Sequence, residues 1–270
     1  MKKHLSTIFL ALVFFVGLSV VLYPTVSDWW NQRHASRAIA SYDETAQSLT
    51  QEDTDAYFAA ADAYNAQLAA TDGAFYDPQL VPGYESTLDI SGTGIMGYIT
   101  IEKINVQLPI YHGTSDGVLQ VAVGHLEGTS LPVGGAFTHC VLSAHRGLPS
   151  ALLFSNLDQL EVGDTFTVTV LDRLLTYEVD QISIVLPEEV DNLQIVDGQD
   201  YMTLMTCTPY GVNSHRLLVR GRRVENAAAK HINVTPDATR IDPMLVAPVV
   251  ALPILLILLA VLLIRYRKKR

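Results

Sequence analysis

The apolar residues divide the chain into a long middle segment and two uninterrupted hydrophobic runs near its ends. Residues 5–23 form a run of 19 residues without a charged side chain, and residues 244–264 form a second run of 21. Each run is long enough to cross a bilayer as a helix. Between the runs, apolar positions recur with short periods, which is typical of a folded domain. The pattern therefore predicts one folded domain between two transmembrane helices.

The first part of the middle segment, residues 24–74, has the spacing of helices. Apolar side chains recur three or four positions apart in residues 39–49 and again in residues 57–68. Between the two series, Thr50 and Asp53 resemble the capping arrangement that begins a helix. The pattern predicts two helices that pack against each other as a hairpin.

The chain then changes to the signals of β-structure. Residues 75–94 are rich in Gly, Pro and Asp and are expected to form a loop. Beyond them, β-branched and alternating apolar stretches separated by turn residues predict a mainly β domain at residues 95–224, a closed barrel or a sandwich. The eight expected strands are residues 97–101, 106–110, 120–123, 138–144, 165–171, 174–186, 201–207 and 216–222. A short helix is expected at residues 151–153, and a helical turn at residues 156–160.

Charge gives the orientation of the two spans. Lys2 and Lys3 precede the first run in the short flank at residues 1–4, and five basic residues follow the second run in the tail at residues 265–270. Because basic residues favour the cytoplasmic side, both termini are expected in the cytoplasm. The middle segment, including a linker at residues 225–243, is then extracellular. The alternative for the first run is a cleaved signal peptide, but residues 23–26 make a poor cleavage site.

The middle segment is strongly acidic. All 28 Asp and Glu residues lie between the two runs, against 11 of the 18 Lys and Arg residues. A nucleic-acid partner is excluded because phosphate binding needs a basic surface. The acidity is typical of a soluble domain at a cell surface.

Cys207 is the first candidate for chemistry. It closes the apolar run TLMTC at residues 203–207, a turn-rich stretch follows, and Arg216 begins the next predicted strand. If the two strands pair as a hairpin, Cys207 and Arg216 face each other across its open loop. A thiol beside a guanidinium has a lowered pKa, so Cys207 is a candidate nucleophile.

The second cysteine leaves an alternative open. An exported domain with two cysteines invites a disulfide, here between Cys140 and Cys207. Cys140 lies in an apolar stretch that reads as a buried strand, where a free thiol is an ordinary core residue. His139, Cys140 and His145 are also residue types that bind zinc, but no second cysteine lies close to them, and no metal is expected.

A cysteine nucleophile needs a base, and the middle segment offers seven histidines. His145 ends a predicted apolar strand at the mouth of a loop, as Cys207 does. His125, in a Gly-His-Leu-Glu-Gly stretch, is the main rival. His145 is the preferred candidate for general acid and base.

At these residues the sequence resembles the sortases, cysteine transpeptidases of the Gram-positive cell surface. The resemblance rests on TLMTC, Arg216 and His145. It is sharper for the pilus-assembling class C branch, through the motifs IMGYI at 95–99, LPIYHGT at 108–114, GHLEGTSLP at 124–132, HRGLPS at 145–150 and TCTPYG at 206–211. Two membrane spans are also typical of that class.

The resemblance implies an eight-stranded sortase-type β-barrel with Cys207, His145 and Arg216 grouped at one end. It also implies a lid in the loop at residues 75–94, usually with an Asp-Pro-aromatic motif. Asp77, Pro78 and Gln79 stand at that place, so the aromatic position holds glutamine, and Phe75 or Tyr76 is the expected substitute. Asp77 is expected to pair with Arg216.

The implied activity is cleavage of an LPxTG-type sorting signal of pilin subunits through a thioacyl enzyme, followed by isopeptide bonding to a lysine. Arg216 would stabilise the oxyanion and position the substrate. No cofactor is expected, and the protein is expected to be a monomer in the cell membrane of a Gram-positive bacterium. One alternative is a sortase that anchors proteins to cell-wall peptide amines. The other is a non-enzymatic, membrane-tethered β-domain with a Cys140–Cys207 disulfide.

Overall fold

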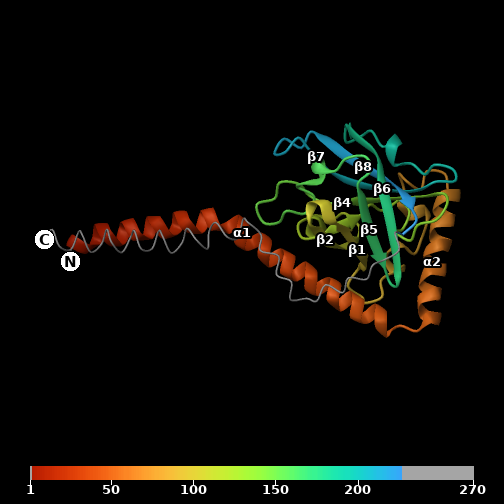
Figure 1. Cartoon of the computed structure of the whole chain (residues 1–270), viewed down its shortest axis with the longest axis horizontal. Helices are drawn as coiled ribbons and strands as arrows, with labels where there is room; N and C mark the ends of the chain where they lie inside the picture. Colours follow the sequence, from red (N-terminus) through yellow and green to blue (C-terminus); the bar gives the residue numbers. More distant parts are fainter. Residues whose placement is uncertain (1, 227–270) are drawn as a thin grey trace. The chain divides into compact units, whose positions relative to one another are not determined.

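Eight strands of the protein form a closed barrel (Figure 1). The computed structural model describes residues 2–226, with side chains from residue 11 onward. The strand order around the barrel is β1-β2-β3-β4-β7-β8-β6-β5, in which β2–β3 and β4–β7 are parallel and the other pairs are antiparallel. The strands are β1 Ile95–Ile101, β2 Val106–His112, β3 Val123–His125, β4 Thr138–Ser143, β5 Thr165–Val170, β6 Arg173–Val185, β7 Asp200–Thr208 and β8 His215–Val224.

The strands form where the sequence alternates. In β5 the residues Phe166, Val168 and Val170 are buried and the threonines between them are not. This period of two fills the barrel interior from one face of each strand. Gly97 allows close approach of β1 to β5, because a Cβ at this position would lie 2.3 Å from the backbone oxygen of Thr169.

Two long helices precede the barrel. Helix α1 spans Lys2–Ser48 and helix α2 spans Gln51–Ala70. The predicted cap is confirmed: the Thr50 side chain accepts from the Asp53 backbone, and the Asp53 carboxylate accepts from the Thr50 backbone. The chain divides into two compact units, and the barrel belongs to the unit Asp28–Ala228.

The two predicted helices form, but the prediction that they pack against each other as a hairpin is wrong. Figure 1 shows α2 turning away from α1. Each helix instead packs on the barrel. Tyr42 of α1 is 1% exposed and its hydroxyl bonds to two barrel backbones, while Asn65 of α2 bonds both the nitrogen and the oxygen of Leu131. The apolar stripe of each helix therefore faces a sheet rather than the other helix.

Two smaller predictions also differ from the structure. The strand expected at residues 120–123 begins at Val123, because residues before it form the short helix α3, Asp116–Leu119, and a turn. No helix forms at residues 151–153, where the chain turns irregularly before a short 3-10 helix at Leu157–Gln159. That 3-10 helix confirms the expected turn at 156–160. Further 3-10 helices are Pro78–Leu80, Tyr84–Ser86, Glu102–Ile104 and Asp191–Leu193.

Within residues 2–226, α1 is the one helix whose length and composition suit a membrane span. Its apolar window has a mean hydropathy of 1.7 and is not buried against the protein. The first predicted span, residues 5–23, falls on this helix. The second predicted span, at 244–264, and the tail at 265–270 lie outside the described residues, as does nearly all of the predicted linker.

Replacing Tyr42 by phenylalanine tests how firmly α1 is held on the barrel. The Tyr42 hydroxyl donates to the backbone oxygen of Met96 at 2.8 Å and accepts from the backbone nitrogen of Leu171 at 2.9 Å. Tyr42→Phe leaves both buried groups unpaired, so we expect a loss of about 1–3 kcal/mol of unfolding free energy. Thermal unfolding of the full chain in detergent measures this loss of unfolding free energy. Tyr57→Phe on α2 is the control, and an equal loss in both variants contradicts the prediction.

Candidate active site

The predicted pairing of Cys207 with Arg216 is confirmed. Strands β7 and β8 pair antiparallel, and the register places Cys207 directly opposite Arg216. The intervening turn is closed by two backbone bonds to the Pro209 oxygen, from Val212 and Asn213. The Arg216 guanidinium donates to the backbone oxygens of Asn213 and His215 at 3.4 and 3.2 Å. The arginine is thus anchored by the loop that follows the cysteine.

His145 joins this pair from the other side of β7. Strands β4 and β7 are parallel with Ser143 opposite Met205, and the Ala144 nitrogen donates to the Met205 oxygen. Continuing this register by two residues puts His145 level with Cys207. Because neighbouring strands lie about 4.8 Å apart, the backbones of His145, Cys207 and Arg216 fall in one row of about 10 Å.

The row lies on the outer surface of the barrel. Leu204 of β7 and Leu217 of β8 belong to the interior core, and the residues that alternate with them belong to a separate apolar group outside it. We call this group the outer cluster; its buried members are Val141, Val185, Leu193 and Leu218. By the period of two, Cys207 faces outward beside Met205.

Cys140 lies on the opposite face. It is 2% exposed inside the barrel, and burial raises the pKa of its thiol well above the usual value. A neutral, enclosed thiol is not a nucleophile. Cys207 is only partly buried, and both cysteines are free. Cys140 lies opposite Met202 in the β4–β7 pair, and Met202 is five residues before Cys207 on β7. This places the two cysteines about 16 Å apart along the sheet. That distance is too long for a disulfide, so the disulfide alternative is wrong.

An apolar groove of about 250 Å³ leads to Arg216. Its walls come from the loop after β3, from the lid loop, from the β6–β7 loop and from β7 itself. The lining residues are Phe75, Leu126, Glu127, Pro187, Val190, Leu193, Met205 and Arg216. The groove therefore lies over the outer cluster and includes Arg216 in its lining, so it can hold an extended apolar peptide segment beside a positive charge.

The loop that carries His145 is supported from α1. Asn31 donates to the Ser150 oxygen at 2.8 Å, and the Asp28 carboxylate accepts from the Leu152 nitrogen at 2.8 Å. The Phe154 nitrogen donates to the His145 oxygen at 3.2 Å. These bonds hold the backbone and leave the partly exposed His145 imidazole available for proton transfer.

His125, the rival base, is built into the interior. It is fully buried, and its two ring nitrogens bond to the Tyr84 hydroxyl and the Ser130 oxygen. Burial lowers the pKa of His125 to about 4. It is therefore neutral at pH 7 and has no path to a substrate on the outer surface.

The predicted lid residues lie in the loop after α2. Asp77 and Gln79 are exposed, and Pro78 begins the 3-10 helix Pro78–Leu80. No ion pair joins Asp77 to Arg216 in the described part of the chain, so the expected pairing is not made. Phe75, one of the two expected substitutes, lines the apolar groove beside Arg216, whereas Tyr76 is 72% exposed.

Sequence reasoning missed the walls of the groove. Met205 was detectable, because it alternates with core residues on a strand that was predicted. Pro187, Val190 and Leu193 were not, because they lie in an irregular loop whose path depends on tertiary packing. Within residues 2–226, no three His, Cys, Asp or Glu side chains converge on a possible metal position.

Comparison with known proteins identifies the family to which this chain belongs. A family model for the sortase domain matches residues 99–224. A crystal structure of sortase C1 from Streptococcus agalactiae is 52% identical, covers 71% of this chain and 100% of its own, and has a TM-score of 0.65. A structure of sortase C1 of GBS pilus island 1 is 40% identical over 73% of this chain and 95% of its own, with a TM-score of 0.65.

A curated relative is more distant. Sortase A of Streptococcus agalactiae is 31% identical over 117 residues, which are 42% of this chain and 47% of the relative. The match thus spans about half the length of that protein. The solved structures, by contrast, are matched over nearly their whole length. With the eight-stranded barrel and the sortase-domain match, these likenesses show that the chain belongs to the sortase family of cysteine transpeptidases.

Proposed function

We propose that this protein is a membrane-anchored sortase that cleaves an LPxTG-type sorting signal and joins pilin subunits through lysine isopeptide bonds. The observation that carries the proposal is the row of His145, Cys207 and Arg216, whose Arg216 also lines an apolar groove. The name of the similar sortase from a pilus island supports the pilin substrate. The apolar part of α1 is suited to hold the enzyme at the membrane.

The first half-reaction makes a thioester. The Cys207 thiolate attacks the carbonyl carbon of the threonine in the sorting signal, and the bond from that carbon to the following nitrogen breaks. The leaving amine takes its proton from the His145 imidazolium. Arg216 donates hydrogen bonds to the negative charge on the carbonyl oxygen as the tetrahedral intermediate forms.

The second half-reaction uses the same groups in reverse. A lysine amine of the next subunit attacks the thioester, gives its proton to His145, and releases the Cys207 thiolate. Water competes with this amine, so a site that excludes water favours transfer over hydrolysis. Phe75, an aromatic side chain that lines the groove, suits that need.

Mass spectrometry of the full chain in detergent tests the nucleophile. With an LPxTG-type peptide, we expect an added mass equal to the acyl fragment, because the thioester retains the part of the peptide before the broken bond. The Cys207→Ala variant is expected to gain none. Cys140→Ala is the matched control and keeps the adduct, since Cys140 lies inside the barrel. An adduct that depends on Cys140 contradicts the assignment.

Arg216→Lys tests the oxyanion role. Lysine keeps the charge but lacks the planar fork of donors, so we expect kcat for acylation to fall about 100-fold with a smaller change in KM. Arg222→Lys is the control, because Arg222 lies on the same strand and its exposed side chain pairs with Glu178. Steady-state kinetics of peptide cleavage give both constants. Equal rates in Arg216→Lys and wild type would remove Arg216 from the mechanism.

Phe75→Ala tests the lid. The ring is partly buried against the groove, so removing it is expected to speed alkylation of Cys207 by iodoacetamide up to about tenfold. Tyr76→Ala is the control because that ring is 72% exposed. Asp77→Ala is expected to change the rate little, since Asp77 makes no ion pair with Arg216. Faster alkylation in Asp77→Ala but not in Phe75→Ala contradicts this account of the lid.

A further inference from the structure

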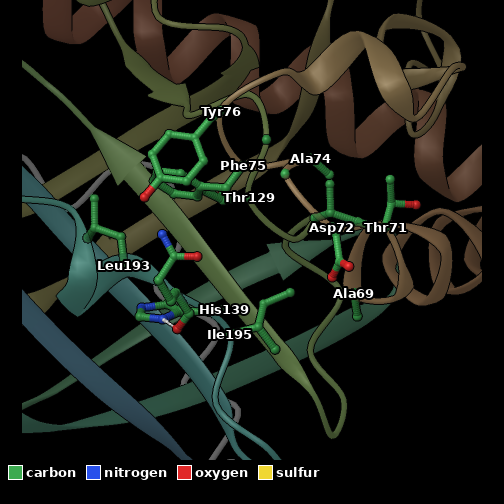
Figure 2. Close-up of a pocket in the computed structure, with 14 residues that line it drawn as sticks. Ala69, Thr71, Asp72, Ala74, Phe75, Tyr76, Thr129, His139, Leu193 and Ile195 are labelled. Carbon is green, nitrogen blue, oxygen red and sulfur yellow. Dashed lines mark hydrogen bonds between the residues drawn. The ribbon is translucent and has the colours of Figure 1, made fainter.

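A second hollow lies on the outer surface of the barrel, and the mechanism does not use it (Figure 2). We call it the polar hollow; its volume is about 230 Å³. Residues at the end of α2 and the start of the lid loop form one wall, and the β6–β7 loop forms another. His139 of β4 and Thr129 lie between these walls, and Asp72 stands at the rim.

Gln194, one of the residues that line the polar hollow, carries an unpaired hydrogen-bond donor. The side-chain nitrogen of Gln194 is buried and donates to no acceptor in the described part of the chain. An unpaired buried amide costs free energy that a carbonyl entering the hollow would recover. The Asp72 carboxylate is exposed, and no basic Lys or Arg lines the hollow. The hollow therefore suits a peptide backbone with a positively charged side chain.

His139 has a structural role in this hollow. Its Nδ1 donates to the Gln194 backbone oxygen at 2.8 Å, and its Nε2 accepts from the Thr203 hydroxyl at 2.7 Å. Burial lowers the pKa of His139 to about 4, so the ring is neutral at pH 7. His139 thus fixes the Gln194 backbone and leaves the Asp72 charge without a competing cation.

The polar hollow continues the apolar groove. Phe75 and Leu193 line both cavities, so they form the wall between them. His139 and His145 are six residues apart and follow the same outward face of β4 and its extension. At about 3.3 Å a residue, the hollow lies about 20 Å from the catalytic row, the reach of about six residues of extended peptide.

The chemistry of the sorting signal sets the direction of the bound peptide. In an LPxTG-type signal the apolar Leu-Pro pair precedes the broken bond, and the apolar groove is the surface that fits it. The chain before the leucine then runs onward past Phe75 and Leu193. About three residues before the leucine, it reaches the polar hollow.

We propose that the polar hollow is a subsite for the substrate segment upstream of the sorting motif, and that Asp72 selects a basic side chain there. The proposal rests on the proposed function, because the sorting signal sets the position of the peptide. The acceptor lysine is not the occupant, since its amine must reach the Cys207 thioester about 20 Å away. The Gln194 amide donates to a carbonyl of the bound segment.

Peptide binding to the full-length Cys207→Ala chain in detergent tests the subsite without chemistry. Three fluorescent peptides are compared: a bare LPxTG-type peptide, one extended upstream by six residues with lysines two to four positions before the leucine, and the same extension with glutamates. We expect the lysine extension to bind about fivefold more tightly than the bare peptide, and the glutamate extension to show no gain.

Two variants assign the effect to the hollow. Asp72→Asn is expected to reduce the preference for lysine over glutamate by about two- to fivefold. Gln194→Leu removes the donor without leaving a cavity, and it is expected to reduce the gain from the lysine extension while keeping thermal stability. Asp62→Asn, at an exposed carboxylate of α2, is the matched control and keeps the full preference.

Equal affinity of the bare and the lysine-extended peptides overturns the subsite, as does a lysine preference that survives Asp72→Asn. The acyl-adduct experiment on the wild-type enzyme separates this from the proposed function. An adduct from the bare peptide with no effect of the extension refutes the subsite alone. An upstream preference that depends on Asp72, without any adduct, supports the subsite and contradicts the transpeptidase.

Discussion

The parallel pairing of β4 with β7 is the constraint on which the site depends. It aligns residues about 62 positions apart in the chain, as the bond from the Thr206 hydroxyl to the Ala144 oxygen illustrates. A parallel pair needs a long crossover, and here β5 and β6 supply it while closing the barrel. Shifting β7 by one residue would turn Cys207 into the barrel and Thr206 outward. The buried outer cluster and the interior core both oppose that shift.

The same alternation explains why two cysteines in one sheet have different chemistry. Cys140 is enclosed by core side chains that raise its pKa, whereas Cys207 stands outside at a strand end beside a guanidinium. The buried histidines follow the same logic. His125 and His139 are bonded at both ring nitrogens and are held neutral, so they support backbone turns. The His145 imidazole makes no such bond within residues 2–226.

The sequence predicted what local patterns determine. The pattern of apolar, β-branched and turn residues predicted all eight strands, although β3 lies a few residues later than expected. The Thr50–Asp53 pair predicted the start of α2. The hairpin between α1 and α2 was mispredicted because an apolar stripe does not say which surface covers it. The groove walls and the polar hollow depend on the irregular loop at residues 186–194 and on the lid loop. Their shape is set by tertiary contacts such as the bond from His139 to Gln194.

The loop at residues 75–94 is tied to the barrel more firmly in its later part than in its earlier part. Its later part is fixed: Tyr84 is buried, and its hydroxyl bonds to His125 and accepts from the Gly113 nitrogen. Its earlier part relies on local bonds, since the Tyr76 and Asp77 nitrogens both donate to the Gly73 oxygen. A displacement of Phe75 from the groove would therefore leave the hydrogen bonds of the Tyr84 hydroxyl intact. A peptide in the polar hollow would contact this same early part of the loop, because Phe75 lines both the hollow and the apolar groove.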